Sequence, residues 1–182
     1  MARKISITKE FIVKTAFQMV KQEGIEQVTA RKLAAKAECS TQPIFRAYEN
    51  MDELYRELFR KTNAYYTFYY DRFLKHEEEP FVNMAYAYIL FAKEEPNLFR
   101  FLFMPKQDYG KSPYEVLNGE KGIVVAELEK AKKDGCKNVS DVFAKMWIFV
   151  HGAACMTISG DYDLDEDQTI KMLKDVYKAF KY

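Results

Sequence analysis

The sequence predicts an all-α fold of about nine helices, and three features of the chain support this fold class. Apolar residues recur three or four positions apart through most of the chain, which is the spacing of one helix face. Ser, Thr, Asn and Asp stand where these stretches begin, and Gly stands where several of them end, as helix caps do. No stretch alternates apolar and polar residues as a half-buried strand would, and there is no internal repeat.

The first half of the chain predicts three short helices and one long helix. We expect helices over residues 8–23, 29–37, 40–47 and 50–76. Gly24 ends the first, while Thr29 and Ser40 are N-cap candidates for the next two. Asn50 and Glu53 have the spacing of a capping box at the start of the fourth.

The second half predicts five further helices. Four of them span residues 81–93, 97–103, 113–133 and 140–159. The fifth follows an acidic turn at residues 161–165 and runs to the C-terminus. We expect a loop over residues 105–112 and a bend in the helix 113–133 near Gly119 and Gly122.

Residues 28–55 have the layout of a helix-turn-helix followed at once by a third helix. In DNA-binding proteins of this kind the second helix of the motif enters the major groove. If Ile44 and Tyr48 point inward, then Thr41, Gln42 and Arg46 point outward, where they can reach base edges.

The same segment resembles the TetR family of transcriptional regulators. The matching positions are Ala16, Met19, Gly24, Thr29, Arg31, Leu33, Ala34, Ala37, Ser40, Phe45, Tyr48, Glu53 and Leu54. The resemblance covers about the first 55 residues of the chain. Beyond them the chain agrees in length and helical character, and a W-x-x-x-H-G stretch at Trp147, His151 and Gly152 resembles one branch of the family.

Three positions depart from the family pattern. Glu38 stands where the turn usually has Gly. Phe45 replaces a Tyr whose hydroxyl reaches a phosphate, and Met51 replaces a Lys at the start of the following helix. The last two changes each remove an expected contact with the DNA backbone.

The predicted DNA-binding residues surround the motif. The start of the second helix offers backbone N–H groups and positive charge to a phosphate, and Arg3 and Lys4 form a basic arm. Thr29 and Ser40 are alternatively helix caps, and the two roles are compatible; Arg31 is alternatively a plain surface charge. The full set is Thr29, Arg31, Lys32, Ser40, Thr41, Gln42, Pro43, Phe45, Arg46 and Tyr48.

Charge divides the chain at about the same place. Residues 1–48 carry nine Lys or Arg against four Asp or Glu, whereas the remainder carries nineteen against twenty-three. A basic head on an acidic body fits phosphate binding by the head, although chance unevenness of solvated charge is the simpler alternative. We expect residues 1–49 to form a DNA-binding domain and residues 50–182 an effector-binding and dimerisation domain.

The C-terminal helices predict a homodimer. One head reads too few base pairs for useful specificity, so paired half-sites in a pseudo-palindromic operator require two copies. The stretch from Met146 to Ile158 has no formally charged residue, and the last helix has an apolar stripe. The predicted interface residues are Gly152, Ala153, Met156, Ile170, Leu173, Val176, Tyr177 and Phe180, which alternatively complete the core of a monomer.

The family resemblance also implies a small-molecule effector, held among the middle helices. That region is densely aromatic, as the walls of an apolar pocket are, so the resemblance favours an apolar or aromatic effector. Candidate contacts are Tyr65, Tyr69, Tyr86, Phe91, Phe103, Trp147 and His151, although aromatic residues at helical spacing are more often plain core.

Other classes of protein have weaker support in the sequence. We expect no cofactor and no metal site, because the two His are far apart and the Asp161–Asp167 run lacks the central Gly and terminal Glu of a calcium loop. Three widely spaced Cys, no secretory leader and no bilayer-spanning apolar run predict a cytoplasmic protein. No catalytic motif is present, and Cys155 and His151 are more consistent with a buried, inert pair than with an enzyme. We therefore expect a homodimeric repressor released by its effector; the alternative is a ligand-binding or protein-interaction module with a degenerate head.

Overall fold

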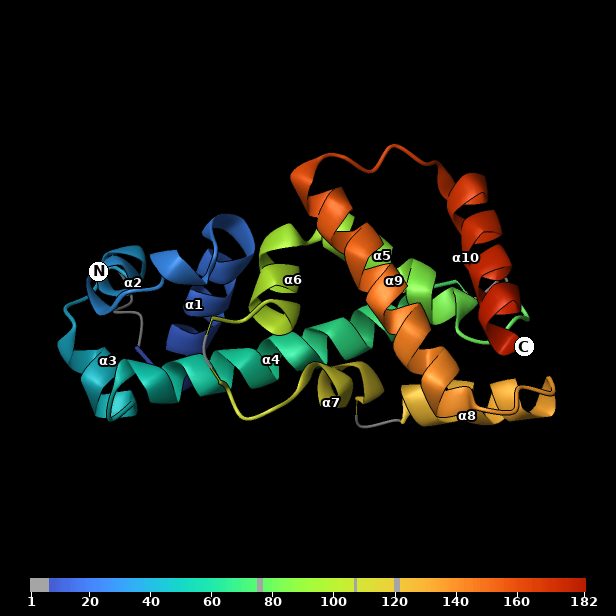
Figure 1. The fold of residues 1–182 in the computed structure, drawn as a ribbon. Coiled ribbons are helices and arrows are strands. Elements are labelled where there is room, and N and C mark those ends of the chain that lie inside the picture. The colour runs from blue at the N-terminus through green and yellow to red at the C-terminus, as the bar shows by residue number, and fades with distance from the viewer. Residues whose placement is uncertain (1–6, 75–76, 107, 120–121) are drawn as a thin grey trace. The chain divides into compact units, whose positions relative to one another are not determined.

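The computed structural model describes residues 7–74, 77–106, 108–119 and 122–182. Within them the chain has ten α-helices and one short 3₁₀ helix, with no strand (Figure 1). The all-α prediction is therefore confirmed. The helices gather into two compact units, one formed by residues up to Tyr65 together with Asn97–Ser112, and the other by Tyr66–Pro96 and Pro113–Tyr182.

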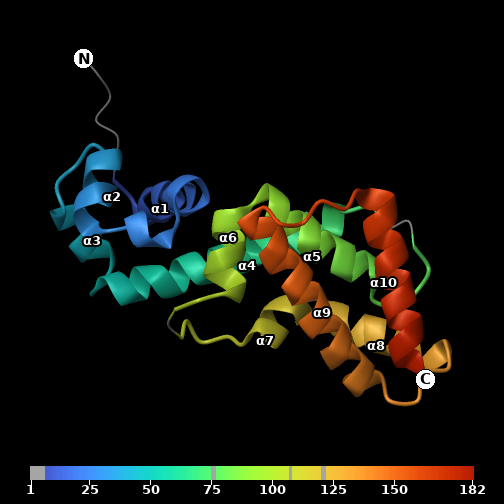
Figure 2. The ribbon, with the colours of Figure 1, turned by 45° about the horizontal axis from the view of Figure 1, so that its top comes forward.

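The first unit contains the helices of the predicted head. These are α1 (Lys9–Glu23), η1 (Ile25–Gln27), α2 (Ala30–Lys36) and α3 (Gln42–Ala47), and Figure 2 shows α1, α2 and α3 gathered together. Thr8 caps α1 by accepting a hydrogen bond from the backbone N–H of Phe11 at 3.1 Å. Gly24 ends α1 in the left-handed half of backbone space, at φ 90°. The core of the unit consists of side chains that are at most 2 % exposed, among them Ile12, Ala16, Met19, Val20, Leu33, Ile44, Leu54 and Leu58.

Helix α4 (Met51–Arg72) contributes residues to both units. The side chain of Asn50 accepts from the backbone N–H of Glu53 at 3.0 Å, as the predicted capping box requires. The return bond differs, because Glu53 accepts from the backbone N–H of Glu49 at 2.8 Å rather than from that of Asn50. The helix ends four residues before the predicted boundary at His76, which itself lies outside the described residues.

The second unit is built around α5 (Val82–Glu94), which packs against α9 (Val139–Ser159) and α10 (Glu166–Lys181) (Figures 1 and 2). Most of α5 is buried. The ring of Phe81, just before it, lies 5.9 Å from the ring of Phe143 on α9 and 5.9 Å from that of Tyr177 on α10. A capping box between Asp165 and Gln168 starts α10, with hydrogen bonds of 3.0 and 2.8 Å.

The predicted helix 113–133 is two helices, α7 (Pro113–Asn118) and α8 (Ile123–Lys133). Gly119 and Gly122 both have positive φ, 57° and 63°, which is incompatible with a continuous right-handed helix. The two glycines therefore separate helices where a bend was predicted. The short α6 (Pro96–Phe103) begins one residue before its predicted start.

Among the described residues, α9 is the one helix long and apolar enough to cross a membrane by length and composition alone. The helices of soluble cores pass the same test, so this is weak support for a membrane span. Asp141 and Lys145 lie in its first two turns, where they form an ion pair at 2.7 Å, and α9 packs on α5, α8 and α10.

Candidate nucleic-acid interface

Helix α2 begins with a capped and positively charged turn. The hydroxyl of Thr29 accepts from the backbone N–H of Lys32 at 3.3 Å, so the capping role of Thr29 is confirmed. Arg31 and Lys32 are exposed on the same turn. Together they form a positively charged helix start, which is a favourable place for a phosphate.

The turn after α2 closes with two hydrogen bonds characteristic of a Schellman motif. The backbone N–H of Cys39 donates to the carbonyl of Ala34 at 3.0 Å, and that of Glu38 donates to the carbonyl of Ala35 at 3.2 Å. This geometry places Glu38 in the left-handed region, at φ 51°. The position is the one at which glycine is preferred, so Glu38 holds a strained backbone conformation.

Helix α3 begins later than the cap at Ser40 predicts. Its first residue is Gln42 and its N-cap is Thr41, whose side chain makes no capping hydrogen bond. The carbonyl of Thr41 starts the helix by accepting from the N–H groups of Ile44 and Phe45 at 3.1 and 3.2 Å. Ser40 is exposed and lies before the cap, outside the helix. Pro43, in the first turn of α3, has no N–H to offer a capping side chain.

The side chains of α3 divide between core and surface as the spacing predicts. Ile44 is fully buried, whereas Gln42 and Arg46 are exposed, and Thr41 and Pro43 are half-buried. Phe45 exposes 51 % of its surface, although phenylalanine side chains are usually buried. The outer face of α3 therefore presents an amide, a guanidinium and an aromatic ring side by side.

Tyr48 belongs to the core of the head. The residue is 1 % exposed, and the Nζ atom of Lys9 lies 4.5 Å from the centre of its ring. Desolvation by burial raises the pKa of the Tyr48 hydroxyl well above its usual value. Tyr48, which the sequence predicted among the DNA-binding residues, is therefore a core residue.

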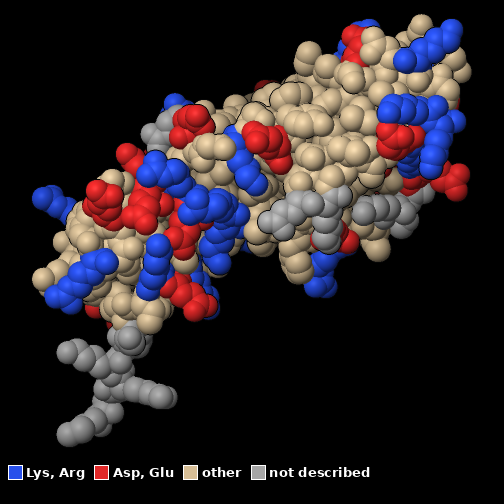
Figure 3. All heavy atoms as spheres, turned by 90° about the horizontal axis from the view of Figure 1, so that it is seen from below, with Lys and Arg blue, Asp and Glu red and all other residues tan. Residues whose placement is uncertain are grey.

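Charge on this surface is mixed. Arg31 and Arg46 make no ion pair with any described residue, whereas Lys36 pairs with Glu23 at 3.4 Å. On the face seen in Figure 3, Lys and Arg side chains at the left-hand end lie among Asp and Glu side chains. The two arginines, and Lys32, which bonds only the neutral Gln27, are therefore the basic groups of this surface that have no carboxylate partner among the described residues. The basic arm predicted at Arg3 and Lys4 lies outside the described residues.

Comparison with known proteins agrees with this geometry. A family model described as "Tetracyclin repressor-like, C-terminal domain" matches residues 81–176, and a model of "Bacterial regulatory proteins, tetR family" matches residues 12–58. The chain belongs to the TetR family. No curated protein matches it.

Solved TetR structures share the fold at low sequence identity. A TetR-like transcriptional regulator from Rhodococcus sp. RHA1 is 13 % identical, with a TM-score of 0.68 and coverage of 97 % of both chains. A TetR-family transcriptional regulator from Haemophilus influenzae RD is 16 % identical, with a TM-score of 0.65 and coverage of 94 % of both chains.

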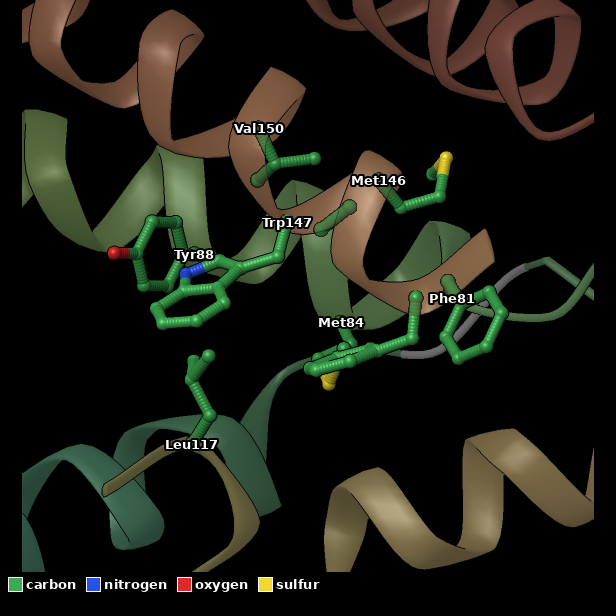
Figure 4. A pocket seen from close by; sticks show the side chains of 9 residues that line it. Phe81, Met84, Tyr88, Leu117, Met146, Trp147 and Val150 are labelled. Atoms are coloured by element: carbon green, nitrogen blue, oxygen red, sulfur yellow. The ribbon is translucent and has the colours of Figure 1, made fainter. Parts of the chain in front are cut away.

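The aromatic residues predicted to bind an effector do not gather around one cavity in the part of the chain that the structure describes. A small cavity of about 20 Å³ lies in the second unit, and Trp147 alone of the predicted set lines it. Its other lining residues lie outside the predicted set of contacts: Phe81, Met84, Ala85, Tyr88, Leu117, Phe143, Met146 and Val150. Figure 4 shows Trp147 of α9 extending between Tyr88 of α5 and Leu117 of α7. The space suffices for about one water molecule.

The remaining predicted effector contacts have partners of their own. Tyr65 belongs to the first unit, where its hydroxyl accepts from the Nζ atom of Lys21 at 3.1 Å. Tyr69 donates to Glu94 at 2.9 Å and lies 5.1 Å, ring to ring, from Phe91. The rings of Tyr86 and Phe73 lie 5.7 Å apart, and Phe103 packs on Phe99 in the first unit at 5.0 Å. His151 lies beside the cavity, with its Nδ1 atom 2.9 Å from the Tyr88 hydroxyl oxygen.

Two properties of the cavity and its immediate surroundings are relevant to ligand binding. The Nε1 atom of Trp147 is buried and makes no hydrogen bond of good geometry, although it interacts with the Tyr88 hydroxyl. Burial lowers the pKa of His151 below its usual value, so its ring is neutral at neutral pH. A ligand with one hydrogen-bond acceptor would satisfy the buried indole N–H.

The predicted dimer residues fall into two groups. Ala153, Leu173 and Tyr177 are at most 5 % exposed and pack within the second unit, so they belong to its own core. Gly152 and Met156 are exposed on α9, while Ile170, Val176 and Phe180 are half-buried on α10. The outer face of α9 also carries Ile148, which is 74 % exposed and absent from the predicted set. Ile148, Gly152 and Met156 recur every four residues, so they form one apolar stripe.

Proposed function

We propose that this TetR protein is a DNA-binding transcriptional repressor that acts as a homodimer and leaves its operator when a small molecule binds. The observation that carries the proposal is the outer face of α3, where Gln42, Phe45 and Arg46 are exposed above a buried Ile44. Residues 1–49 would form the DNA-binding domain and residues 50–182 the effector-binding and dimerisation domain.

Each exposed side chain suits a different part of the duplex. Gln42 has the paired donor and acceptor that match adenine, and Arg46 has the fork that matches guanine or a phosphate. Phe45 and Pro43 offer apolar contact, for which the methyl group of thymine is the partner in the major groove. Thr29, Arg31 and Lys32 would hold the DNA backbone at the start of α2.

The dimer proposal rests on the apolar stripe of Ile148, Gly152 and Met156. Exposed apolar side chains in a row are a common mark of a protein interface, and a two-fold axis would place the stripe of one copy against that of the other. Gly152 would allow the two helices to approach closely, because no atom lies within 4 Å of a Cβ built on it.

The effector proposal rests on the cavity beside Trp147. The lining is apolar with a buried indole N–H, which favours an apolar or aromatic compound that carries one acceptor. Because the cavity holds only about 20 Å³, the lining side chains must move to admit such a compound. Trp147 is the only tryptophan of the chain, so its fluorescence reports on this cavity alone.

Binding to labelled genomic fragments from around the protein's own gene tests the function. Wild-type protein should bind one fragment with a strong dependence on salt. Arg46→Ala should bind about 5- to 150-fold more weakly with an unchanged dimer, whereas Lys133→Ala on α8 should bind normally. Binding without sequence preference or salt dependence would instead indicate a ligand-binding module with a degenerate head.

A further inference from the structure

A second hollow, of about 410 Å³, lies entirely within the first unit. Neither the outer face of α3 nor any residue of the second unit contributes to it. Its volume is within the range of about 300–1,000 Å³ that small-molecule sites occupy. The residues that line it are Gly24, Ile25, Glu26, Tyr55, Asn97, Arg100, Phe101, Met104, Pro105, Lys106 and Tyr109.

One face of α6 and the residue that follows it form a wall of the hollow. Asn97, Arg100, Phe101 and Met104 recur at the spacing of a single helix face. The amide nitrogen of Asn97 donates to the backbone carbonyl of Lys21 at 3.1 Å, which fixes α6 to the end of α1. The wall therefore has a defined position within the unit.

Aromatic rings form the floor, and contacts outside the hollow hold them. The rings of Phe101 and Tyr109 meet edge to face at 5.0 Å, and Phe59, which does not line the hollow, stacks on Tyr109 at 5.3 Å. The Tyr55 hydroxyl donates to the backbone carbonyl of Val28 at 2.7 Å. Because these rings are held by other groups, they do not collapse into the hollow.

The charges around the hollow leave an excess of one positive charge. Lys106 pairs with Glu26 at 3.1 Å. A hydrogen bond from its own backbone and another from Lys106 lower the pKa of the Glu26 carboxyl, so it is ionised at neutral pH. Arg100 is exposed, and its charge is the last of the influences that lower the pKa of Glu26. It makes no ion pair with a described residue, so its guanidinium can still bind an anion.

We propose that this hollow binds a small aromatic carboxylate, with the ring against Tyr55, Phe101 and Tyr109 and the carboxylate on Arg100. A guanidinium binds a carboxylate through two parallel hydrogen bonds, which are stronger than those between neutral groups. A single negative charge balances the unpaired Arg100. The site is separate from the cavity at Trp147, and its occupation does not depend on the proposed repressor function.

Isothermal titration calorimetry of the full chain tests the proposal with 3-phenylpropionate as the probe. Saturable binding with one site per chain is expected. The uncharged 3-phenylpropionamide, which has the same ring and length, should bind about tenfold more weakly or worse. Octanoate should also bind more weakly, because it lacks the ring.

Two variants and one control locate the site. Arg100→Gln should weaken 3-phenylpropionate binding about tenfold or more. Met104→Trp should abolish binding by filling the hollow with the charges intact. Arg56→Gln removes another exposed arginine of the same unit that does not line the hollow, so binding should be unchanged. Circular dichroism checks that each variant is folded.

Three results would overturn the proposal: no saturable binding at millimolar probe, equal binding of the amide or of octanoate, or equal losses in Arg100→Gln and Arg56→Gln. None of these measurements involves DNA. Failure here would leave the repressor proposal intact, and failure to bind DNA would leave this site intact.

Discussion

At the scale of single residues, Glu38 has the clearest local strain in the head. Its φ of 51° belongs to the left-handed region. For a residue with a β-carbon this conformation costs about 1–2 kcal/mol, because Cβ comes too close to the following carbonyl oxygen. The turn tolerates it because the hydrogen bonds of Cys39 to Ala34 and of Glu38 to Ala35 are both formed. The resemblance to the TetR family marks this position as one that usually has Gly, and the structure supplies the physical reason.

Replacing Glu38 with glycine should stabilise the head. Glu38→Gly removes the β-carbon from a left-handed position, so the free energy of unfolding should rise by about 1 kcal/mol in urea titrations. Glu38→Ala is the matched control, because it removes the same charge but keeps the β-carbon. Equal stabilisation by both variants would assign the effect to charge and not to backbone strain.

His151 should make stability depend on pH in a defined window. Burial lowers the pKa of the folded residue, so the unfolded chain takes up the proton first as pH falls. The free energy of unfolding should therefore decrease from about pH 7 downward, through the unfolded-state value of about 6.5. This loss should end once the folded histidine is itself protonated.

Unfolding of wild type and His151→Gln at several pH values between about 5 and 8 measures this effect. The variant keeps a polar partner for the Tyr88 hydroxyl but does not titrate, so its stability should be flatter over the window. Carboxylates whose pKa is lowered in the folded chain, such as those of Glu26 and Asp134, destabilise the protein only at lower pH. Parallel curves for the two proteins would exclude His151 as the source.

At the scale of helices, sequence predicts starts and ends well where a cap is local. Gly24, Thr29 and Asn50 act within one turn of the chain, so their effect is visible in sequence. The split between α7 and α8 was missed because two glycines are compatible with either a bend or a break. The predicted start of α3 was wrong because Ser40 and Thr41 are adjacent and both are possible caps. The sequence alone does not show which of the two begins the helix.

The sequence predicted the outer face of α3 better than it predicted the cavity at Trp147. The short helix α3 has one buried face, so Gln42 and Arg46 were correctly expected outside. Helix α5 is buried nearly all round, and its sequence gives no preferred face. Which of its rings approaches Trp147 depends on the packing of α5, α7 and α9, and Tyr88 was consequently missed.

The apolar stripe of α9 leads to a prediction about assembly. Ile148→Glu would bury a carboxylate twice in a two-fold interface, once from each copy, so the dimer should dissociate at least about a hundredfold more readily. Sedimentation equilibrium measures the change. Val125→Glu on α8 is the control, because Val125 is also exposed, at 49 %, but lies off the stripe. A dimer unaffected by Ile148→Glu would place the interface elsewhere.

At the scale of the whole molecule, the two units divide the proposed tasks between them. The first contains α2 and α3 with their unpaired arginines, and the second contains the apolar stripe and the cavity at Trp147. The net charge of the chain is only +1, so DNA binding cannot rest on a general positive field. It must rest on a few arginines and lysines placed at the head. Each of these side chains that contacts a phosphate should contribute to the salt dependence of the DNA affinity.

Arg31→Gln tests this distribution of charge. Each phosphate contact contributes about 0.9 to the slope of log affinity against log salt concentration. If Arg31 holds one phosphate in each head of a dimer, the variant should lower that slope by about 1.8 and weaken all fragments nearly equally. Lys133→Gln on α8 removes a charge from the second unit and should leave the slope unchanged. A slope unchanged in Arg31→Gln would mean that the start of α2 does not touch the DNA backbone, whereas a change of only about 0.9 would mean that a single head is engaged.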